Sequence, residues 1–194
     1  HLNALWIAQN LVLTAAAMHR LGLYVEAYGL THWRIAALLW EGLVAVGLAL
    51  IVVRITTARS GAWLAGANLL TGSAVLYVAC FIDFSAMIAE HNLAHARRVG
   101  LAPDIAHISS LGPSAIPAIE RHLLASAGLP DRSGLARLVW IRDREAAWLA
   151  AARRDWRSDS LRMTRVASRL AGDGPLCGLP LYRFISACAG GKGT

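Results

Sequence analysis

The chain has 194 residues, 56% of them hydrophobic, and a mean hydropathy of +0.47. It is too apolar for an ordinary soluble domain, and its apolar residues are bunched into long runs. The formal net charge is +7, and the whole excess lies in residues 97–194. Because 18 of the 19 basic residues are arginines diluted by acidic residues, attraction to anionic lipid headgroups explains the charge more simply than nucleic-acid binding. We therefore expect a lipid bilayer, and no nucleic acid, as a partner.

Three apolar segments are expected to cross a membrane, because each approaches the roughly 20 residues that a bilayer requires. They comprise residues 4–26, 33–54 and 62–89. In the first segment, Gln9 and Asn10 interrupt the apolar run. A secretory signal peptide is the alternative for this segment, but a signal peptide begins with basic residues, whereas here the basic residues come last. Before the second, Gly29 and Thr31 provide a turn and a helix cap. We expect the third helix to continue unbroken as a polar extension to about residue 99, which ends the membrane region.

The chain beyond this region is predicted to be helical and cytoplasmic. Arg97 and Arg98 follow the third span, so the positive-inside rule places the C-terminal half in the cytoplasm. Residues 100–172 are expected to form helices in the cytoplasm or at the membrane interface, and residues 173–194 a weakly ordered tail. Breaks between these helices are expected at Gly112–Pro113 and at Gly128–Pro130. No strand-period alternation occurs, so the fold class is all-α: a polytopic helical membrane protein with three transmembrane helices and a helical, basic C-terminal segment.

Two charges inside the second span need explanation. Arg34 and Glu41 are seven residues apart, on one helix face and about 10 Å apart along the axis. A carboxylate this deep in a span must be paired or protonated. We expect Glu90 to hold Arg34, and Glu41 to depend on Arg20, on His19 or on a proton. Polar residues at the same ends of the three spans are predicted to converge in one leaflet, as an ion-pair network or as a pocket that binds a lipid headgroup or relays protons: His19, Arg20, Arg34, Glu41, Asp83, Glu90, His91 and Asn92.

The histidines raise the question of a metal site. His91 and His95 are four residues apart, so both could face one ion from a helix. The zincin pattern needs a glutamate after the first histidine, but Asn92 stands there, and no third ligand is fixed by spacing. A haem held by His19 and His91 is conceivable in geometry alone, and the three cysteines form no C-x-x-C pair. We therefore expect no cofactor and keep His91 and His95 as the metal candidates.

Three tryptophans mark the long helix predicted from residue 133. Trp140, Trp148 and Trp156 are spaced by eight residues, which gives a slanted stripe among arginines on a helix. Such a stripe is consistent with core packing against the neighbouring helices. It is also consistent with an interfacial helix lying on the anionic leaflet.

Four motifs occur in order along the chain: "YGLTHWR", "IDFSAMIAEHNLAHAR", "DIAHISSLGPSAIPAI" and "DWRSDSLRMTRV". Their order and spacing resemble the C-terminal part of a bacterial family of polytopic inner-membrane proteins known only as a domain of unknown function. The resemblance covers about residues 23–170. It implies a bacterial inner membrane and further helices before His1, and it implies no reaction.

The sequence favours a protein that is not an enzyme. No nucleophile motif occurs, and the terminal "GGKGT" follows no strand and opens no helix, as a phosphate loop would. We predict a structural, scaffold or sensor component of a larger membrane assembly, with other membrane-protein subunits as partners. The alternative is a transporter-like or lipid-handling protein that uses the polar residues of one leaflet as its pocket.

Overall fold

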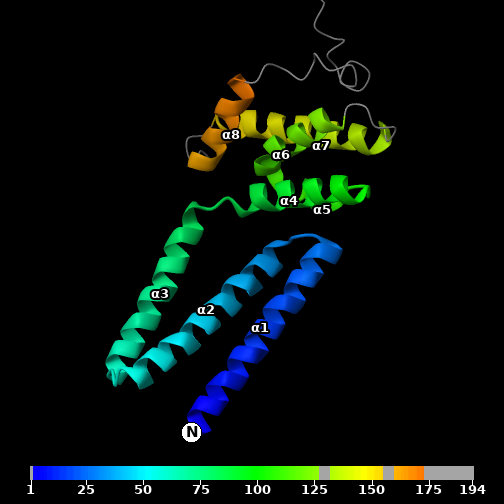
Figure 1. Cartoon of the computed structure of the whole chain (residues 1–194). Helices are drawn as coiled ribbons and strands as arrows, with labels where there is room; N and C mark the ends of the chain where they lie inside the picture. The colour runs from blue at the N-terminus through cyan, green and yellow to red at the C-terminus, as the bar shows by residue number, and fades with distance from the viewer. Residues whose placement is uncertain (1, 127–131, 155–159, 173–194) are drawn as a thin grey trace, which may run out of the picture. The chain divides into compact units, whose positions relative to one another are not determined.

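The computed structural model describes residues 2–126, 132–154 and 160–172. Within those residues every regular element is a helix and no strand occurs (Figure 1). The elements are α1 (Leu2–Tyr28), α2 (His32–Thr56), α3 (Gly61–Phe81), α4 (Phe84–Val99), α5 (Ile105–Ser109), the 3-10 turn η1 (Gly112–Ala115), α6 (Ile116–Ala125), α7 (Arg132–Ala152) and α8 (Leu161–Gly172). The all-α prediction is confirmed for the described residues, and the tail predicted at 173–194 lies outside them. The chain divides between Ile82 and Asp83 into two compact units.

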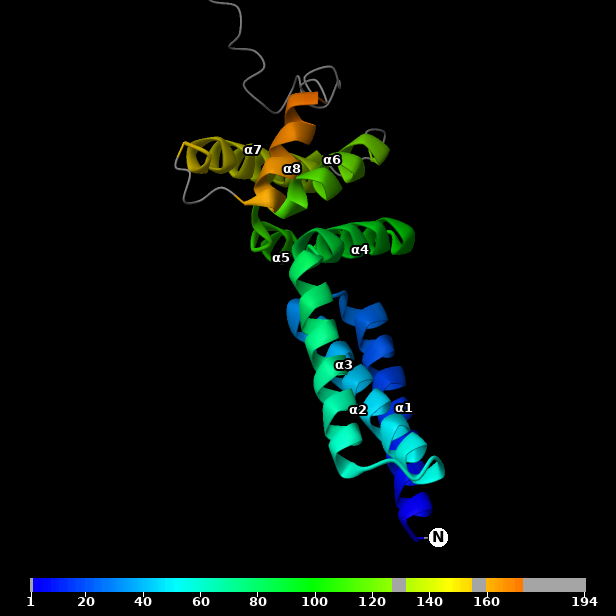
Figure 2. The same cartoon turned by 90° about the vertical axis from the view of Figure 1, so that its left-hand side faces the viewer.

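The first unit contains α1, α2 and α3, and α1 packs against α2 as an antiparallel hairpin (Figures 1 and 2). The predicted turn between them is confirmed. Gly29 has a φ of +76°, in the left-handed region that glycine adopts without strain. The Thr31 hydroxyl caps α2 by accepting a hydrogen bond from the backbone N–H of Arg34 at 3.3 Å. Further along, α2 and α3 approach closely, since a Cβ on Gly47 would lie 3.3 Å from the Asn68 Oδ1.

Two helices, α2 with 25 residues and α3 with 21, are long and apolar enough to cross a membrane by length and composition. They are apolar on every side, and only Ile35 and Leu48 of α2 are buried within the chain, with no buried residue in α3. The prediction of three spans is therefore corrected to two candidate spans, because α1 does not qualify. Although α1 has 27 residues, its polar residues Gln9, Asn10 and Arg20 leave no sufficiently apolar stretch.

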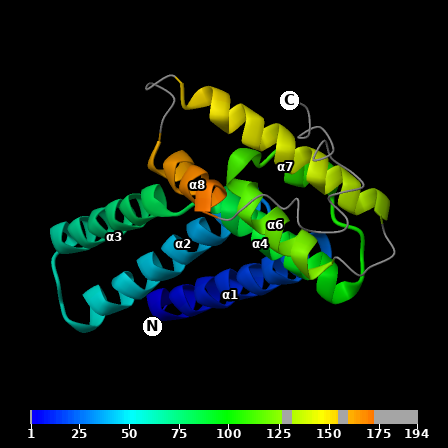
Figure 3. The same cartoon turned by 90° about the horizontal axis from the view of Figure 1, so that it is seen from above.

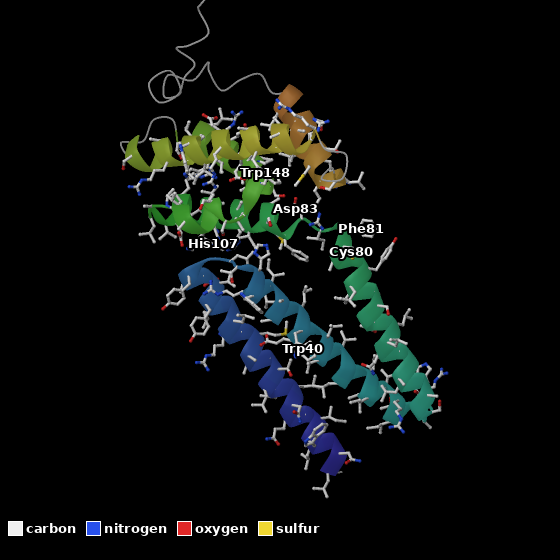
Figure 4. All side chains as sticks on the ribbon, turned by 180° about the vertical axis from the view of Figure 1, so that it is seen from behind. Trp40, Cys80, Phe81, Asp83, His107 and Trp148 are labelled. Atoms are coloured by element: carbon white, nitrogen blue, oxygen red, sulfur yellow. The ribbon has the colours of Figure 1, made fainter. Side chains whose placement is uncertain are left out.

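The expected unbroken helix over 62–99 is also corrected. Helix α3 ends at Phe81, and α4 begins at Phe84; Figure 4 labels Phe81 and the cap residue Asp83. Asp83 causes the new start, because its Oδ1 accepts a hydrogen bond from the backbone N–H of Ala86 at 3.1 Å. Aspartate is among the best residues at a helix N-cap, where it satisfies an N–H that has no intrahelical partner.

The second unit is a helical bundle in which α6 packs against both α4 and α7 (Figure 2), while α7 runs lengthwise across it (Figure 3). Its fully buried side chains come from α4 to α7: Ile88, Leu93, Ile108, Ile119, Leu138 and Ile141. A second cluster of Ile116, Leu149 and Val166 joins α8 to α6 and α7. The break predicted at Gly112–Pro113 appears as η1, whereas that at Gly128–Pro130 lies outside the described residues. Burial of each large apolar side chain stabilises this arrangement by about 1.5–3 kcal/mol.

Candidate functional site

Arg34, the first charge of α2, is bound by the carboxyl-terminal end of α1. Its Nη1 donates hydrogen bonds to the carbonyl oxygens of Tyr28, at 3.1 Å, and of Gly29. The guanidinium carbon lies 5.8 Å from the centre of the Tyr28 ring. The last carbonyls of a helix have no intrahelical donor and form the negative end of the helix dipole. Arg34 therefore ties α1 to α2 by neutralising carbonyl oxygens.

Glu41 is the unexplained charge of the first unit. Its Oε2 is buried and has no hydrogen-bond partner among the described residues. The predicted partner Arg20 lies instead over the ring of Tyr24, 5.8 Å from its centre, and His19 is exposed on α1. A carboxylate inside an apolar helix is expensive unless it is paired or protonated. The described helices α1, α2 and α3 supply no hydrogen-bond partner for this oxygen.

Asp83 and Glu90 both have partners within the second unit. In addition to capping α4, Asp83 accepts a hydrogen bond at its Oδ2 from the Ser114 hydroxyl at 2.8 Å, which ties α4 to η1. The Glu90 Oε2 lies 2.5 Å from the Nη2 of Arg121 on α6, and both side chains are largely exposed. An exposed pair of this kind is worth about 0–1 kcal/mol. Arg34 and Glu90 were predicted to pair with each other. In the structure, Arg34 binds carbonyl oxygens at the end of α1, and Glu90 pairs with Arg121.

His91 and His95 lie one turn apart on α4, as predicted, with parallel rings whose centres are 6.3 Å apart. Burial lowers the pKa of His91, and the positive charges of His95 and Arg98 lower it further. Its Nε2 is buried and has no hydrogen-bond partner among the described residues. Within the same residues, no group of three or more His, Cys, Asp or Glu side chains could hold a metal ion. Among the described residues, the pair therefore has no third ligand with which to hold a metal ion.

The predicted polar cluster is divided between the two units. His19, Arg20, Arg34 and Glu41 belong to the first unit, and Asp83, Glu90, His91 and Asn92 belong to the second. Asn92 is half-buried on α4.

A cavity of about 320 Å³ in the second unit was not predicted. Among the described residues, its polar lining comprises Arg97 on α4, the buried His122 on α6 and the buried Ser126, which caps the end of α6. The Nδ1 of His122 and the hydroxyl of Ser126 have no hydrogen-bond partner among the described residues. A signal for them exists in the sequence, because Ile119, His122, Leu123 and Ser126 recur at helical spacing and place two polar residues on an apolar face.

The cavity favours the neutral form of its histidine. Burial lowers the pKa of His122, and repulsion by the Arg97 guanidinium lowers it further. A hydrogen bond to the backbone of Leu93 acts in the opposite direction. The Nδ1 of His122 is the ring nitrogen without a hydrogen-bond partner among the described residues.

An ion-pair network joins α6 to α7. The Nε and Nη2 of Arg142 each lie 2.9 Å from the Oε1 of Glu120. The Nη1 of Arg142 lies 3.0 Å from the Oδ1 of Asp143. The side chains of Arg142 and Glu120 are only 17% and 15% exposed, so this pair is shielded from solvent and holds the two helices in register.

Helix α7 carries an exposed face of arginine and tryptophan. Trp140 and Trp148 are 60% and 50% exposed, and Trp148 is labelled in Figure 4. Arg137 and Arg144 are exposed at neighbouring positions, and the Arg144 guanidinium lies 4.9 Å from the centre of the Trp140 ring. Core packing is therefore wrong for these two tryptophans; Trp156 lies outside the described residues.

The fold and these sites define an all-helical protein that combines two helices long and apolar enough to cross a membrane with a helical bundle containing a polar-lined cavity. The chain belongs to the family described as a domain of unknown function (DUF4153), whose model matches residues 1–122. The predicted resemblance to a domain of unknown function is confirmed, but its range of about residues 23–170 is corrected, because the match runs from residue 1 to residue 122, within α6. No curated protein and no solved structure matches the chain.

Proposed function

We propose that the protein is a non-enzymatic structural, scaffold or sensor component of an assembly in a bacterial inner membrane, with its second unit in the cytoplasm. The observation that carries the proposal is the exposure of α2 and α3. Their large exposed side chains include Trp33, Leu39, Trp40, Leu69, Leu70, Leu76 and Tyr77. A helix that is apolar on every side belongs in a protein core or in a membrane, and these two helices have almost no protein around them.

Glu41 supports a protein partner in addition to lipid. Its buried Oε2 has no hydrogen-bond partner among the described residues, and lipid tails supply no donor. Charged residues in membrane helices almost always face a bundle interior or a wet cavity. A donor from a neighbouring subunit would satisfy the carboxylate, which makes the Glu41 face of α2 the proposed contact within the assembly.

The exposed face of α7 supports docking of the second unit to an anionic leaflet. Arg137, Trp140, Arg144 and Trp148 follow one another at steps of three and four residues, so they lie on one side of the helix. Arginine attracts anionic headgroups, at about 1 kcal/mol for each basic residue near the surface, and tryptophan prefers the headgroup level. The basic last turn of α4 adds the positive-inside argument for a cytoplasmic location.

The membrane location is tested by replacing two exposed leucines of α3, Leu69 and Leu70, with arginine. In a membrane, each arginine near the helix centre adds about 2.5–3.5 kcal/mol to the cost of insertion. We expect the unaltered chain to stay in the membrane pellet through an alkaline carbonate wash and the Leu69→Arg/Leu70→Arg chain to be lost from it.

The matched control is Leu161→Arg on α8, which changes an equally exposed leucine and should leave the chain in the pellet. Release of the unaltered chain by carbonate, or an arginine pair that leaves fractionation and yield unchanged, contradicts the membrane proposal. The assembly is tested separately with a photoreactive amino acid in place of Glu41. A discrete cross-linked product should form there and not from position 161, whereas a chain that stays monomeric refutes a subunit contact at Glu41.

A further inference from the structure

The cavity of the second unit has the size and wall of a ligand site. Its volume of about 320 Å³ lies within the usual range for pockets that hold small molecules, about 300–1,000 Å³. Gly100 ends α4 in the left-handed conformation, with φ of +73°, so the chain turns back and residues 101–103 form part of the wall. The apolar lining comes from Ala96, Leu101, Pro103, Leu135 and Leu138.

Two buried polar atoms in this wall have no partner among the described residues, the Nδ1 of His122 and the Oγ of Ser126. His122 is 7% exposed and Ser126 is not exposed at all. Buried polar groups in native proteins are hydrogen bonded with few exceptions. The two groups lie one helical turn apart and belong to residues that line the same cavity, and we infer that a bound molecule completes their hydrogen bonding.

The charges around the cavity select the chemistry of that molecule. Arg97 lines the cavity, and no aspartate or glutamate occurs among the lining residues that the structure describes. Ser126 can donate a hydrogen bond from its hydroxyl, and both ring nitrogens of His122 are donors when the imidazole is protonated. An anion in the cavity would favour that proton by offsetting the repulsion from Arg97. Three donors in an otherwise apolar pocket match a carboxylate on an apolar body.

We propose that the cavity between α4, α6 and α7 binds a small monocarboxylic acid with an apolar chain, such as a medium-chain fatty acid, its carboxylate held by Arg97, His122 and Ser126. The chain of the acid lies against Leu101, Leu135 and the other apolar residues of the wall. This site goes beyond the membrane role, because neither α2 nor α3 contributes to it.

The test is photolabelling of the full-length chain in lipid nanodiscs, or in buffer if carbonate releases it, with octanoate that carries a diazirine on its chain. Mass spectrometry of the digested protein locates the label. We expect labelled peptides from residues 96–103, 122–126 and 134–138, and suppression of this labelling by excess octanoate. Octyl phosphate, octanol and octylammonium are the competing ligands that separate carboxylate recognition from binding of other headgroups or of the apolar chain alone.

Variants assign the roles of the polar residues. Ser126→Ala should weaken competition by octanoate about tenfold, the usual effect of losing one hydrogen bond to a charged group. Ser168→Ala, on the exposed face of α8, is the matched control and should change nothing. Ala96→Leu should fill the cavity and abolish its labelling while circular dichroism and the melting temperature show a folded chain. His122→Gln keeps a side chain that can bond to the Leu93 backbone and should remove the preference of the site for the acid over octanol.

The outcomes separate the alternatives. Octanol or octylammonium competing as well as octanoate overturns the carboxylate assignment, and octyl phosphate competing better assigns the site to a phosphate instead. Label that falls only on α1 to α3, or equally in the Ala96→Leu chain, refutes the site and leaves water as the partner of His122 and Ser126. A failed carbonate test does not affect any of these results, so the two proposals fail independently.

Discussion

The ion pair between Glu120 on α6 and Arg142 on α7 allows the packing of the second unit to be tested quantitatively. Replacing Arg142 by methionine keeps most of the side-chain volume and removes the charge. The Glu120 carboxylate then loses two N–H donors at 2.9 Å, and Asp143 loses one at 3.0 Å. Because Glu120 is only 15% exposed, water restores little of this hydrogen bonding.

The magnitude follows from the burial of the pair. Removing one partner of a fully buried ion pair costs about 3–5 kcal/mol. Since Arg142 and Glu120 both keep some exposure, we discount this to about 2–3 kcal/mol for Arg142→Met. Glu120→Gln should cost only about 1 kcal/mol, because the amide oxygen still accepts a hydrogen bond and Asp143 still pairs with Arg142. Replacing both Glu120 and Arg142 by methionine should recover part of the loss, with a coupling of about 1 kcal/mol or more.

Native-state hydrogen exchange of the full chain measures this effect locally, in peptides from α6 and α7. A loss of about 2–3 kcal/mol predicts exchange roughly 30–150 times faster in Arg142→Met. The control is Arg121→Met, which breaks the exposed pair with Glu90 and should accelerate exchange by no more than about fivefold. Equal effects of the two variants, or strict additivity of the Glu120 and Arg142 changes, would refute the reasoning from burial.

Two further predictions concern the surface of α7 and the cavity histidine. Trp140→Ala/Trp148→Ala should weaken binding of the second unit to anionic lipid. The measurement is the protection of α7 amides from hydrogen exchange in nanodiscs with and without anionic lipid. Protection that is equal in both nanodiscs and unchanged by the substitutions would argue against docking. The folded-state pKa of His122 is below its ordinary value of 6.5, so the unfolded chain binds the proton more readily and stability is lost as pH falls below about 6.5. Between about pH 7.5 and about pH 5, the melting temperature of His122→Gln should therefore drop less than that of the unaltered chain. Part of the remaining drop is due to His91, whose pKa is also lowered. A drop equal to that of the unaltered chain would count against a titrating His122.

The turn between α1 and α2 could be predicted from the sequence because it depends on neighbours. Gly29 takes a positive φ, and Thr31 bonds to the backbone three residues later. The start of α4 depends on an equally local contact, Asp83 to Ala86. The prediction of an unbroken helix was wrong there because apolar residues flank Asp83 on both sides and hide the break; the local signal for it is the capping preference of aspartate.

The pairing of charges could not be predicted in the same way. Glu90 was predicted to pair with Arg34, but its partner, Arg121, comes from α6. Arg34 binds partners close to it in the chain, the carbonyl oxygens at the end of α1. These oxygens are available because the last carbonyls of a helix have no intrahelical donor. The charges of Arg20 and Glu41 cannot by themselves indicate whether the two helices bring the side chains into contact.

The sequence by itself determined the helices, their first turns and the apolar character of α2 and α3, because each depends on residues within about one turn of one another. Only the tertiary structure decided which side chains are buried and with what they pair. It placed Trp140 and Trp148 outside the bundle, although tryptophan is apolar enough for a core. It placed His122 and Ser126 inside, beside a cavity made by three helices. The physical reason is that burial depends on which helix faces pack together, and that choice is made by contacts between residues far apart in the chain.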